Sequence, residues 1–172
     1  MKMKIVGAVI AAVLIVAGGA YYFGIYGANG TLKVNVTDPL PAGWSAVYVN
    51  VTQISIHNST AGNGHGFAKS FSSPVELNLA SAANKSVFLA SLSLPKGHYQ
   101  MIRLTLTGAY GVYEGKTFRI TLVSSTVDIA GQFTIGSGST TTVVLNFNSA
   151  QAIHGNSVIG FTMTPVVGMT VG

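Results

Sequence analysis

The sequence contains no cysteine and only four acidic residues in 172 positions. Without thiols the chain can form no disulfide, no thiolate zinc site, no iron–sulfur cluster and no cysteine nucleophile. The four acids are too widely spaced to form the carboxylate pair of a glycosidase or the alternating aspartates of a calcium loop. Packing and hydrogen bonding must therefore stabilise the fold, and we expect neither enzymatic activity nor a bound cofactor.

Basic residues are also few. The chain has nine Lys or Arg residues and a net charge of +5, and Lys2 and Lys4 precede a long apolar segment, which leaves a net charge of +3 for the rest. There is no basic run and no basic helix, so we expect no nucleic-acid partner. The surface must be built mainly from Ser, Thr, Asn and Gly. Such a neutral coat changes little with pH and suits an acidic or otherwise harsh exterior.

An apolar segment occupies residues 5–25, and no charged residue or histidine occurs between Lys4 and Lys33. A helix of this length spans roughly the 30 Å hydrocarbon core of a bilayer. Because Lys2 and Lys4 stand before the segment, the positive-inside rule predicts a cytoplasmic amino terminus and an exported remainder. The expected partner of residues 5–25 is therefore the membrane.

A cleaved secretory signal is the alternative for this segment, because the small residues Ala17–Ala20 follow a short apolar core. Under either interpretation we divide the chain into a signal or anchor helix, residues 1–29, and an extracellular domain, residues 30–172. A retained helix would hold the domain at the cell membrane. Cleavage would release a secreted or cell-surface protein.

The domain has the pattern of an all-β protein. From residue 31 onwards apolar residues alternate with polar ones, β-branched residues are frequent, and Gly- and Ser-rich turns separate the runs. About nine short strands predict an antiparallel β-sandwich of immunoglobulin-like or transthyretin-like kind, with a closed barrel as the alternative. The clearest strands are expected at residues 32–36, 47–56, 75–79, 99–107, 118–122, 126–129, 133–135, 141–147 and 158–167.

Three local features of the domain are specific enough to be tested. The apolar phase of the strand at residues 47–56 changes at Thr52–Gln53, which predicts a β-bulge. Glu114–Gly115 fits the two-residue loop of a hairpin. Ala82–Ala90 is the single segment outside residues 1–29 that we expect to be helical, over about two turns.

Five asparagines fit the Asn-x-Ser/Thr acceptor pattern of N-glycosylation, against roughly two expected by chance from the composition. Asn35 and Asn50 stand at polar positions of predicted strands, where a sugar would not disturb the core. We therefore expect glycosylation of at least two sites in an archaeal or eukaryotic source. The candidate residues are Asn29, Asn35, Asn50, Asn58 and Asn84.

The remaining polar residues indicate structural roles. The four histidines, at positions 57, 65, 98 and 154, lack metal-ligand spacing, so we predict no metal site. Arg103 stands within a predicted strand and is expected to pair with Asp38, Glu76 or Asp128. The glycine-rich segments lack the following helix that a phosphate cradle requires, so we interpret them as turns.

The domain contains five distinctive stretches, at residues 30–39 (GTLKVNVTDP), 47–57 (VYVNVTQISIH), 94–104 (LPKGHYQMIRL), 143–148 (VVLNFN) and 163–167 (MTPVV). Together they resemble the exported archaeal and bacterial family called domain of unknown function 4382. The resemblance implies an exported β-sandwich without an established reaction, and it covers nearly everything from Gly30 to Val167. The family often has acidic residues where this chain has Asn146 and Asn148, so the resemblance implies no cation site there.

These observations favour a structural or interaction protein of the cell surface, namely a membrane-anchored, glycosylated β-sandwich that contacts itself or other envelope proteins. One alternative is a secreted filament subunit. After cleavage near Gly19 or Ala20, the tail Ala20–Asn29 is long enough to add a strand to a neighbour's open sheet edge.

A second alternative is a surface module that binds glycans or metal ions through loops. The candidate loops are Asn58–Gly66 and Gly108–Gly115, with Trp44, Tyr110 and Tyr113 as stacking platforms.

Overall fold

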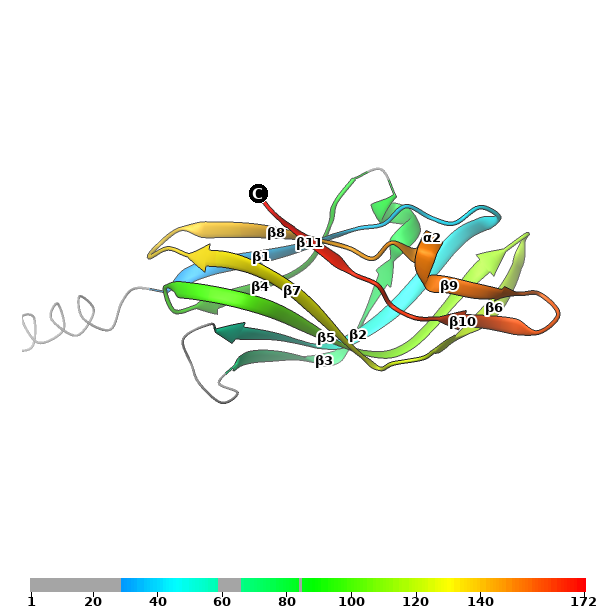
Figure 1. The fold of residues 1–172 in the computed structure, drawn as a ribbon, viewed down its shortest axis with the longest axis horizontal. Coiled ribbons are helices and arrows are strands. Elements are labelled where there is room, and N and C mark those ends of the chain that lie inside the picture. Colours follow the sequence, from blue (N-terminus) through cyan, green and yellow to red (C-terminus); the bar gives the residue numbers. More distant parts are fainter. Residues whose placement is uncertain (1–28, 59–65, 84) are drawn as a thin grey trace, which may run out of the picture.

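The computed structural model describes residues 29–58, 66–83 and 85–172, which form two packed β-sheets with very little helix (Figure 1). The predicted signal or anchor helix lies outside the described residues, as does Asn84. No helix in the described part of the chain is long and apolar enough to cross a membrane. The elements are β1 (Gly30–Thr37), β2 (Trp44–Asn58), β3 (Gly66–Asn78), η1 (Leu79–Ala82), β4 (Val87–Leu94), β5 (Gly97–Tyr113), β6 (Lys116–Leu122), β7 (Thr126–Ile135), β8 (Thr140–Asn146), α2 (Ser149–Ala152), β9 (Ile153–Asn156), β10 (Gly160–Met163) and β11 (Gly168–Val171).

The smaller sheet has the strand order β11-β8-β1-β4, and the larger one the order β3-β2-β5-β6-β10-β9, with β7 also paired to β5. These two sheets confirm an all-β, sandwich-like architecture. Most of the strand pairs are antiparallel. The expectation of an antiparallel sandwich is wrong at two places, because β1 pairs β8 and β6 pairs β10 in parallel. Both pairs join strands that are distant in the sequence. No tight turn connects them, so the sequence does not indicate whether they pair in parallel or antiparallel.

The core lies between the two sheets and is built from the alternating apolar residues of the long strands. Val34 of β1, Ile54 of β2 and Leu104 of β5 are all fully buried. Burial of each such side chain contributes about 1.5–3 kcal/mol relative to exposure. Packing of this kind holds the domain together without disulfides.

The predicted bulge in β2 is confirmed. Val51 pairs with Leu106 and Gln53 with Thr105, so Thr52 is the extra residue on β2. The Thr52 hydroxyl donates a hydrogen bond of 3.2 Å to the Thr105 carbonyl oxygen. The bulge returns the apolar residues that follow to the core, since Ile54 and Ile56 are fully buried.

The predicted hairpin at Glu114–Gly115 is also confirmed, since these two residues connect β5 to β6. Both have positive φ, 47° at Glu114 and 76° at Gly115. Two successive left-handed residues are the geometry of a type I′ turn, which matches the twist of the flanking strands. Gly115 meets this requirement without steric cost.

The predicted helix at Ala82–Ala90 is wrong. The 3-10 helix η1 ends at Ala82, and β4 begins at Val87. β4 pairs antiparallel with β1, from Val36 opposite Val87 to Gly30 opposite Leu94. The helix propensity of the alanines is outweighed by this distant pairing, which buries Leu92 and Leu94 against the core.

Other segments also differ from the prediction, and β3 is much longer than the strand expected at residues 75–79. Residues 126–135 form the single strand β7 rather than two strands. The strand expected at residues 158–167 is divided into a turn after β9, the short strand β10 and the segment that leads to β11. The helical turn α2 has no counterpart among the predicted elements.

Side chains close both seams between the sheets. At one seam, Lys69 of β3 donates from Nζ to the Ser91 carbonyl oxygen of β4 at 3.2 Å. At the other, Thr141 of β8 donates from Oγ1 to the Thr134 carbonyl oxygen of β7 at 2.8 Å. Each bond joins a side chain of one sheet to a backbone acceptor of the other, so the two sheets are linked along both sides.

Candidate functional site

The two ends of the sandwich carry different features. β1 begins at one end, while the β5–β6 and β9–β10 hairpin turns lie at the opposite end (Figure 1). The start of β1 is fixed to the β7–β8 turn, because the Thr31 N–H donates to the Ser139 carbonyl at 2.8 Å and the Gly138 N–H to the Asn29 carbonyl at 3.1 Å. The direction in which the chain enters the domain is therefore set by backbone hydrogen bonds.

The opposite end holds an aromatic cluster of Trp44, Tyr113, Phe118 and Phe161. The ring centroids of Trp44 and Phe161 are 4.7 Å apart in an edge-to-face arrangement, and those of Trp44 and Tyr113 are 5.4 Å apart. A Cβ atom on Gly111 would lie 2.6 Å from the Trp44 ring, so only glycine permits this packing. Trp44 is therefore packed within the fold and is not an open stacking platform, whereas Tyr113 is only partly buried.

The β9–β10 turn exposes two apolar side chains next to this cluster. Val158 is 90% exposed and Ile159 is 79% exposed. The backbone N–H groups of both residues donate to Asn156 Oδ1, at 2.9 and 3.1 Å. The asparagine side chain therefore holds the turn in a conformation that presents both apolar side chains to the surroundings.

The outer face of the larger sheet carries a pair of stacked tyrosines. Tyr48 and Tyr110 are cross-strand partners on β2 and β5, with ring centroids 4.7 Å apart and planes inclined by 14°. The Tyr110 hydroxyl donates to Glu76 Oε2 at 2.8 Å. Because β2 lies between β5 and β3, this bond crosses β2 close to Asn50, which pairs with Glu76. The bond to Glu76, then partial burial and the carboxylate charge, raises the pKa of Tyr110.

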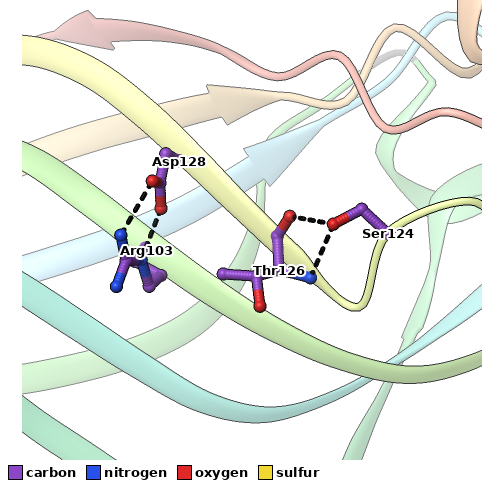
Figure 2. A network of polar contacts seen from close by, with 4 residues as sticks. All are labelled: Arg103, Ser124, Thr126 and Asp128. Carbon is purple, nitrogen blue, oxygen red and sulfur yellow. Dashed lines mark hydrogen bonds and ion pairs between the residues drawn. The ribbon is translucent and has the colours of Figure 1, made fainter.

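Arg103 forms an ion pair with Asp128, one of the three partners expected from the sequence. Its Nε and one terminal nitrogen lie 2.5 and 2.8 Å from the two carboxylate oxygens. Figure 2 shows the pair lying across β5 and β7, beside the hydrogen bonds of Ser124 with Thr126 at the start of β7. Chiefly through these hydrogen bonds, the pair lowers the pKa of Asp128 and raises that of Arg103. Both side chains are close to half exposed, so salt will screen their attraction.

Asp38 is fully buried at the end of β1 and accepts two short hydrogen bonds from Ser149, the first residue of α2. The Ser149 backbone N–H donates to Oδ1 at 2.6 Å and its hydroxyl to Oδ2 at 2.5 Å. Burial raises the pKa of Asp38, and the two bonds from Ser149 oppose that shift. No pattern in the sequence indicates this contact, since the two residues are 111 positions apart.

The loop and metal predictions have separate outcomes. The binding loop expected at Gly108–Gly115 is wrong for most of its length, because Gly108–Tyr113 belongs to β5. Only Glu114 and Gly115 form a turn. Most of the Asn58–Gly66 segment lies outside the described residues. Within residues 29–58, 66–83 and 85–172, no group of three or more His, Asp or Glu side chains is placed to hold a metal ion.

The candidate glycosylation sites differ in their surroundings. Asn29 is exposed, whereas Asn35, Asn50 and Asn58 are partly buried and Asn84 lies outside the described residues. Asn35 Nδ2 lies 3.5 Å from Ser86 Oγ, and its Oδ1 is buried without a hydrogen-bond donor among the described residues. Both Asn35 and Asn50 point away from the core, as expected, but neighbouring side chains partly cover their amides.

Comparisons with known proteins identify a family and nothing more specific. The model of the family described as Domain of unknown function (DUF4382) matches residues 29–165. Neither the search of curated proteins nor the search of solved structures found a match. The match covers almost all of the described sandwich, and the chain therefore belongs to the DUF4382 family.

Proposed function

We propose that this chain is a non-catalytic structural or interaction protein of the cell surface, a sandwich held at the membrane by residues 5–25. The observation that carries the proposal is the separation of the two ends. The chain enters the domain at the Gly30 end, and the apolar Val158–Ile159 turn lies at the other (Figure 1). A tether at the first end would direct this turn away from the membrane, towards envelope components. We further propose the immunoglobulin-like or transthyretin-like kind of sandwich, which the packing of two sheets supports.

The positions of the acids support a non-catalytic role. Asp38 is bonded to Ser149, Glu76 to Tyr110, and Asp128 to Arg103. The fourth acid, Glu114, occupies a hairpin turn. Three of the four carboxylates are thus engaged in contacts that hold the fold, and an acid–base mechanism would need at least one positioned for proton transfer beside a bound substrate.

The absence of native cysteine allows a direct test of orientation. We expect Val158→Cys, as the single thiol of the chain, to react with a membrane-impermeant maleimide in intact cells because the side chain is 90% exposed. Met3→Cys serves as the matched control and should react only after the cells are permeabilised. Reaction of Val158→Cys only after permeabilisation would contradict the proposal. Loss of the Met3→Cys thiol from the mature protein would instead indicate a cleaved signal.

Glycosylation is part of the proposal, and the structure ranks the candidate sites. We expect a glycan on Asn29, which is exposed and precedes β1, in preference to Asn35, Asn50 and Asn58, which lie within strands and are partly buried. Glycopeptide mass spectrometry of native protein measures the occupancy of each site. Asn29→Gln is the control that assigns the first glycopeptide. Unmodified asparagine at all five positions would remove glycosylation from the proposal.

A filament subunit is the second candidate, and the edge strand β4 favours it. β4 borders the smaller sheet and contains no charged residue and no proline over Val87–Leu94. Sheet edges are usually protected by such residues, whereas the β3 edge of the larger sheet has Lys69 and Pro74. The β4 edge, apart from the Ser91 carbonyl oxygen that accepts from Lys69, is therefore suited to accept residues 20–29 of another copy as an added strand. Recovery of monomers with residues 1–30 still in the membrane fraction would count against this assembly.

A further inference from the structure

The partner of β5 changes partway along the strand, and the change opens a fork in the larger sheet. Residues 97–105 of β5 pair with β7, and residues 109–113 pair with β6. The intervening residues, Leu106–Gly108, have no strand partner on that side. The Leu106 N–H instead donates to the Ser125 carbonyl oxygen at 2.7 Å, in the turn between β6 and β7. We call the depression at this point the fork pocket.

The fork pocket has a volume of about 410 Å³, within the range of small-molecule sites. Three hydroxyl-bearing residues and one arginine supply its polar groups. Of its three apolar residues, Leu106 and Ile120 are buried in the core, and Leu122 is partly exposed. The lining residues are Leu106, Thr107, Gly108, Arg119, Ile120, Thr121, Leu122 and Ser125.

Arg119 is the one charged residue that lines this pocket. It is exposed and forms no ion pair or side-chain hydrogen bond with any residue that the structure describes. The other arginine of the sequence, Arg103, is neutralised by Asp128. The pocket therefore carries an uncompensated guanidinium group, whose planar donors match a carboxylate in bidentate geometry.

The neighbouring groups narrow the class of ligand further. Thr107, Thr121 and Ser125 offer hydroxyl groups that can donate to or accept from a polyhydroxylated molecule. Tyr110, the cross-strand partner of Arg119, does not line the pocket, because its ring stacks on Tyr48 and its hydroxyl donates to Glu76. The hydroxyl groups and the guanidinium group together suit a hydroxylated molecule that bears a carboxylate, such as an acidic sugar.

We infer that the fork pocket binds a hydroxylated carboxylate, the chemistry of a uronic acid residue in an acidic polysaccharide. Arg119 binds the carboxylate, and the hydroxyl-bearing residues bind the ring hydroxyls. This binding gives the proposed surface protein a ligand, but it does not depend on whether residues 5–25 hold the chain in a membrane.

The test is calorimetric titration of the full chain in a neutral detergent. We expect trigalacturonate to bind, and neutral galactotriose to bind at least about tenfold more weakly, because the neutral sugar cannot form charged hydrogen bonds with Arg119. Galacturonic acid is titrated in parallel. Tighter binding of the trimer indicates a polysaccharide ligand, whereas equal affinity of the monomer indicates a free hydroxy acid, and either result supports the site.

Matched variants assign the binding to the pocket. Arg119→Gln should weaken trigalacturonate binding about tenfold or more, and Arg119→Lys by less, because lysine keeps the charge but loses the bidentate geometry. Lys116→Gln removes the same charge from the same strand, outside the pocket lining, and should leave the affinity unchanged. Unchanged far-UV circular dichroism would show that each variant is folded. The inference is overturned if the wild-type chain binds neither acid, or if Arg119→Gln and Lys116→Gln have equal effects.

Discussion

Replacing Asp38 by alanine is expected to lower the free energy of unfolding by about 2–4 kcal/mol, because two buried donors would lose their acceptor. Both donors belong to Ser149, and their bonds join the end of β1 to the start of α2. The same region is held by the Asp38 N–H, which donates to the Ala82 carbonyl oxygen at 3.1 Å. Urea denaturation at neutral pH, followed by far-UV circular dichroism, measures the loss.

Asp38→Asn is the control for this variant. The asparagine oxygen can accept from the Ser149 N–H, and its amide can donate to the Ser149 hydroxyl, so both contacts are retained without charge. We expect it to change the free energy of unfolding by about 1 kcal/mol or less. Equal losses in the alanine and asparagine variants would show that the negative charge, rather than hydrogen bonding, makes this contact stabilising.

The same carboxylate gives stability an uncommon dependence on pH. The pKa of Asp38 is raised above 3.8 in the folded state, so between pH 3.8 and the folded pKa the native state binds more protons than the unfolded chain. The contribution of Asp38 is therefore largest below pH 3.8 and falls as the pH rises through the folded pKa. Asp38→Asn should remove this trend. Asp128 acts in the opposite direction, since its lowered pKa adds stability that is lost on acidification.

Replacing Trp44 by alanine is expected to lower the free energy of unfolding by about 3 kcal/mol or more, because large aromatic side chains leave large cavities when truncated. Trp44 is only 9% exposed and contacts Phe161 and Tyr113 in the aromatic cluster. It is the single tryptophan of the chain, so its fluorescence reports on the cluster in the wild-type protein. The variant itself must be followed by circular dichroism in urea.

Tyr48→Ala is the matched control for Trp44→Ala. Tyr48 also lies on β2 and also contacts another ring, but it stands on the outer face of the sheet and is only partly buried. Loss of the Tyr48 ring should lower the free energy of unfolding by about 1 kcal/mol, the typical contribution of a stacked aromatic pair. A cost for Tyr48→Ala as large as that for Trp44→Ala would show that the outer tyrosine pair, and not the cluster, dominates the stability of β2.

The features predicted correctly are those that depend on neighbours in the sequence. The change of apolar phase at Thr52–Gln53 predicts the bulge because alternation is a property of a single strand. Glu114–Gly115 predicts its turn because both positions need positive φ. Arg103 was placed in a strand with three possible acids, and only the register of β5 with β7 selects Asp128.

The features that the sequence could not predict depend on pairing at long range. Ala82–Ala90 has local helix propensity, but its residues from Val87 onwards pair with β1 and form part of strand β4. The fork pocket exists because β6 and β7 each pair with a different part of β5, and no motif in β5 marks the change. Side-chain type alone suggests Trp44 as a binding residue, but it does not distinguish a ring that packs inward, as that of Trp44 does, from one that faces solvent.

The parallel pairing of β1 with β8 has a consequence for the order in which the chain acquires its shape. β1 occupies residues 30–37, yet one of its two ladders requires residues 140–146. Synthesis and translocation deliver the amino-terminal strand long before its distant partner, and such late contacts make folding slow. For a protein that we propose is exported, this delay keeps the polypeptide extended while it threads through a narrow secretion channel, so that the sandwich assembles only on the far side.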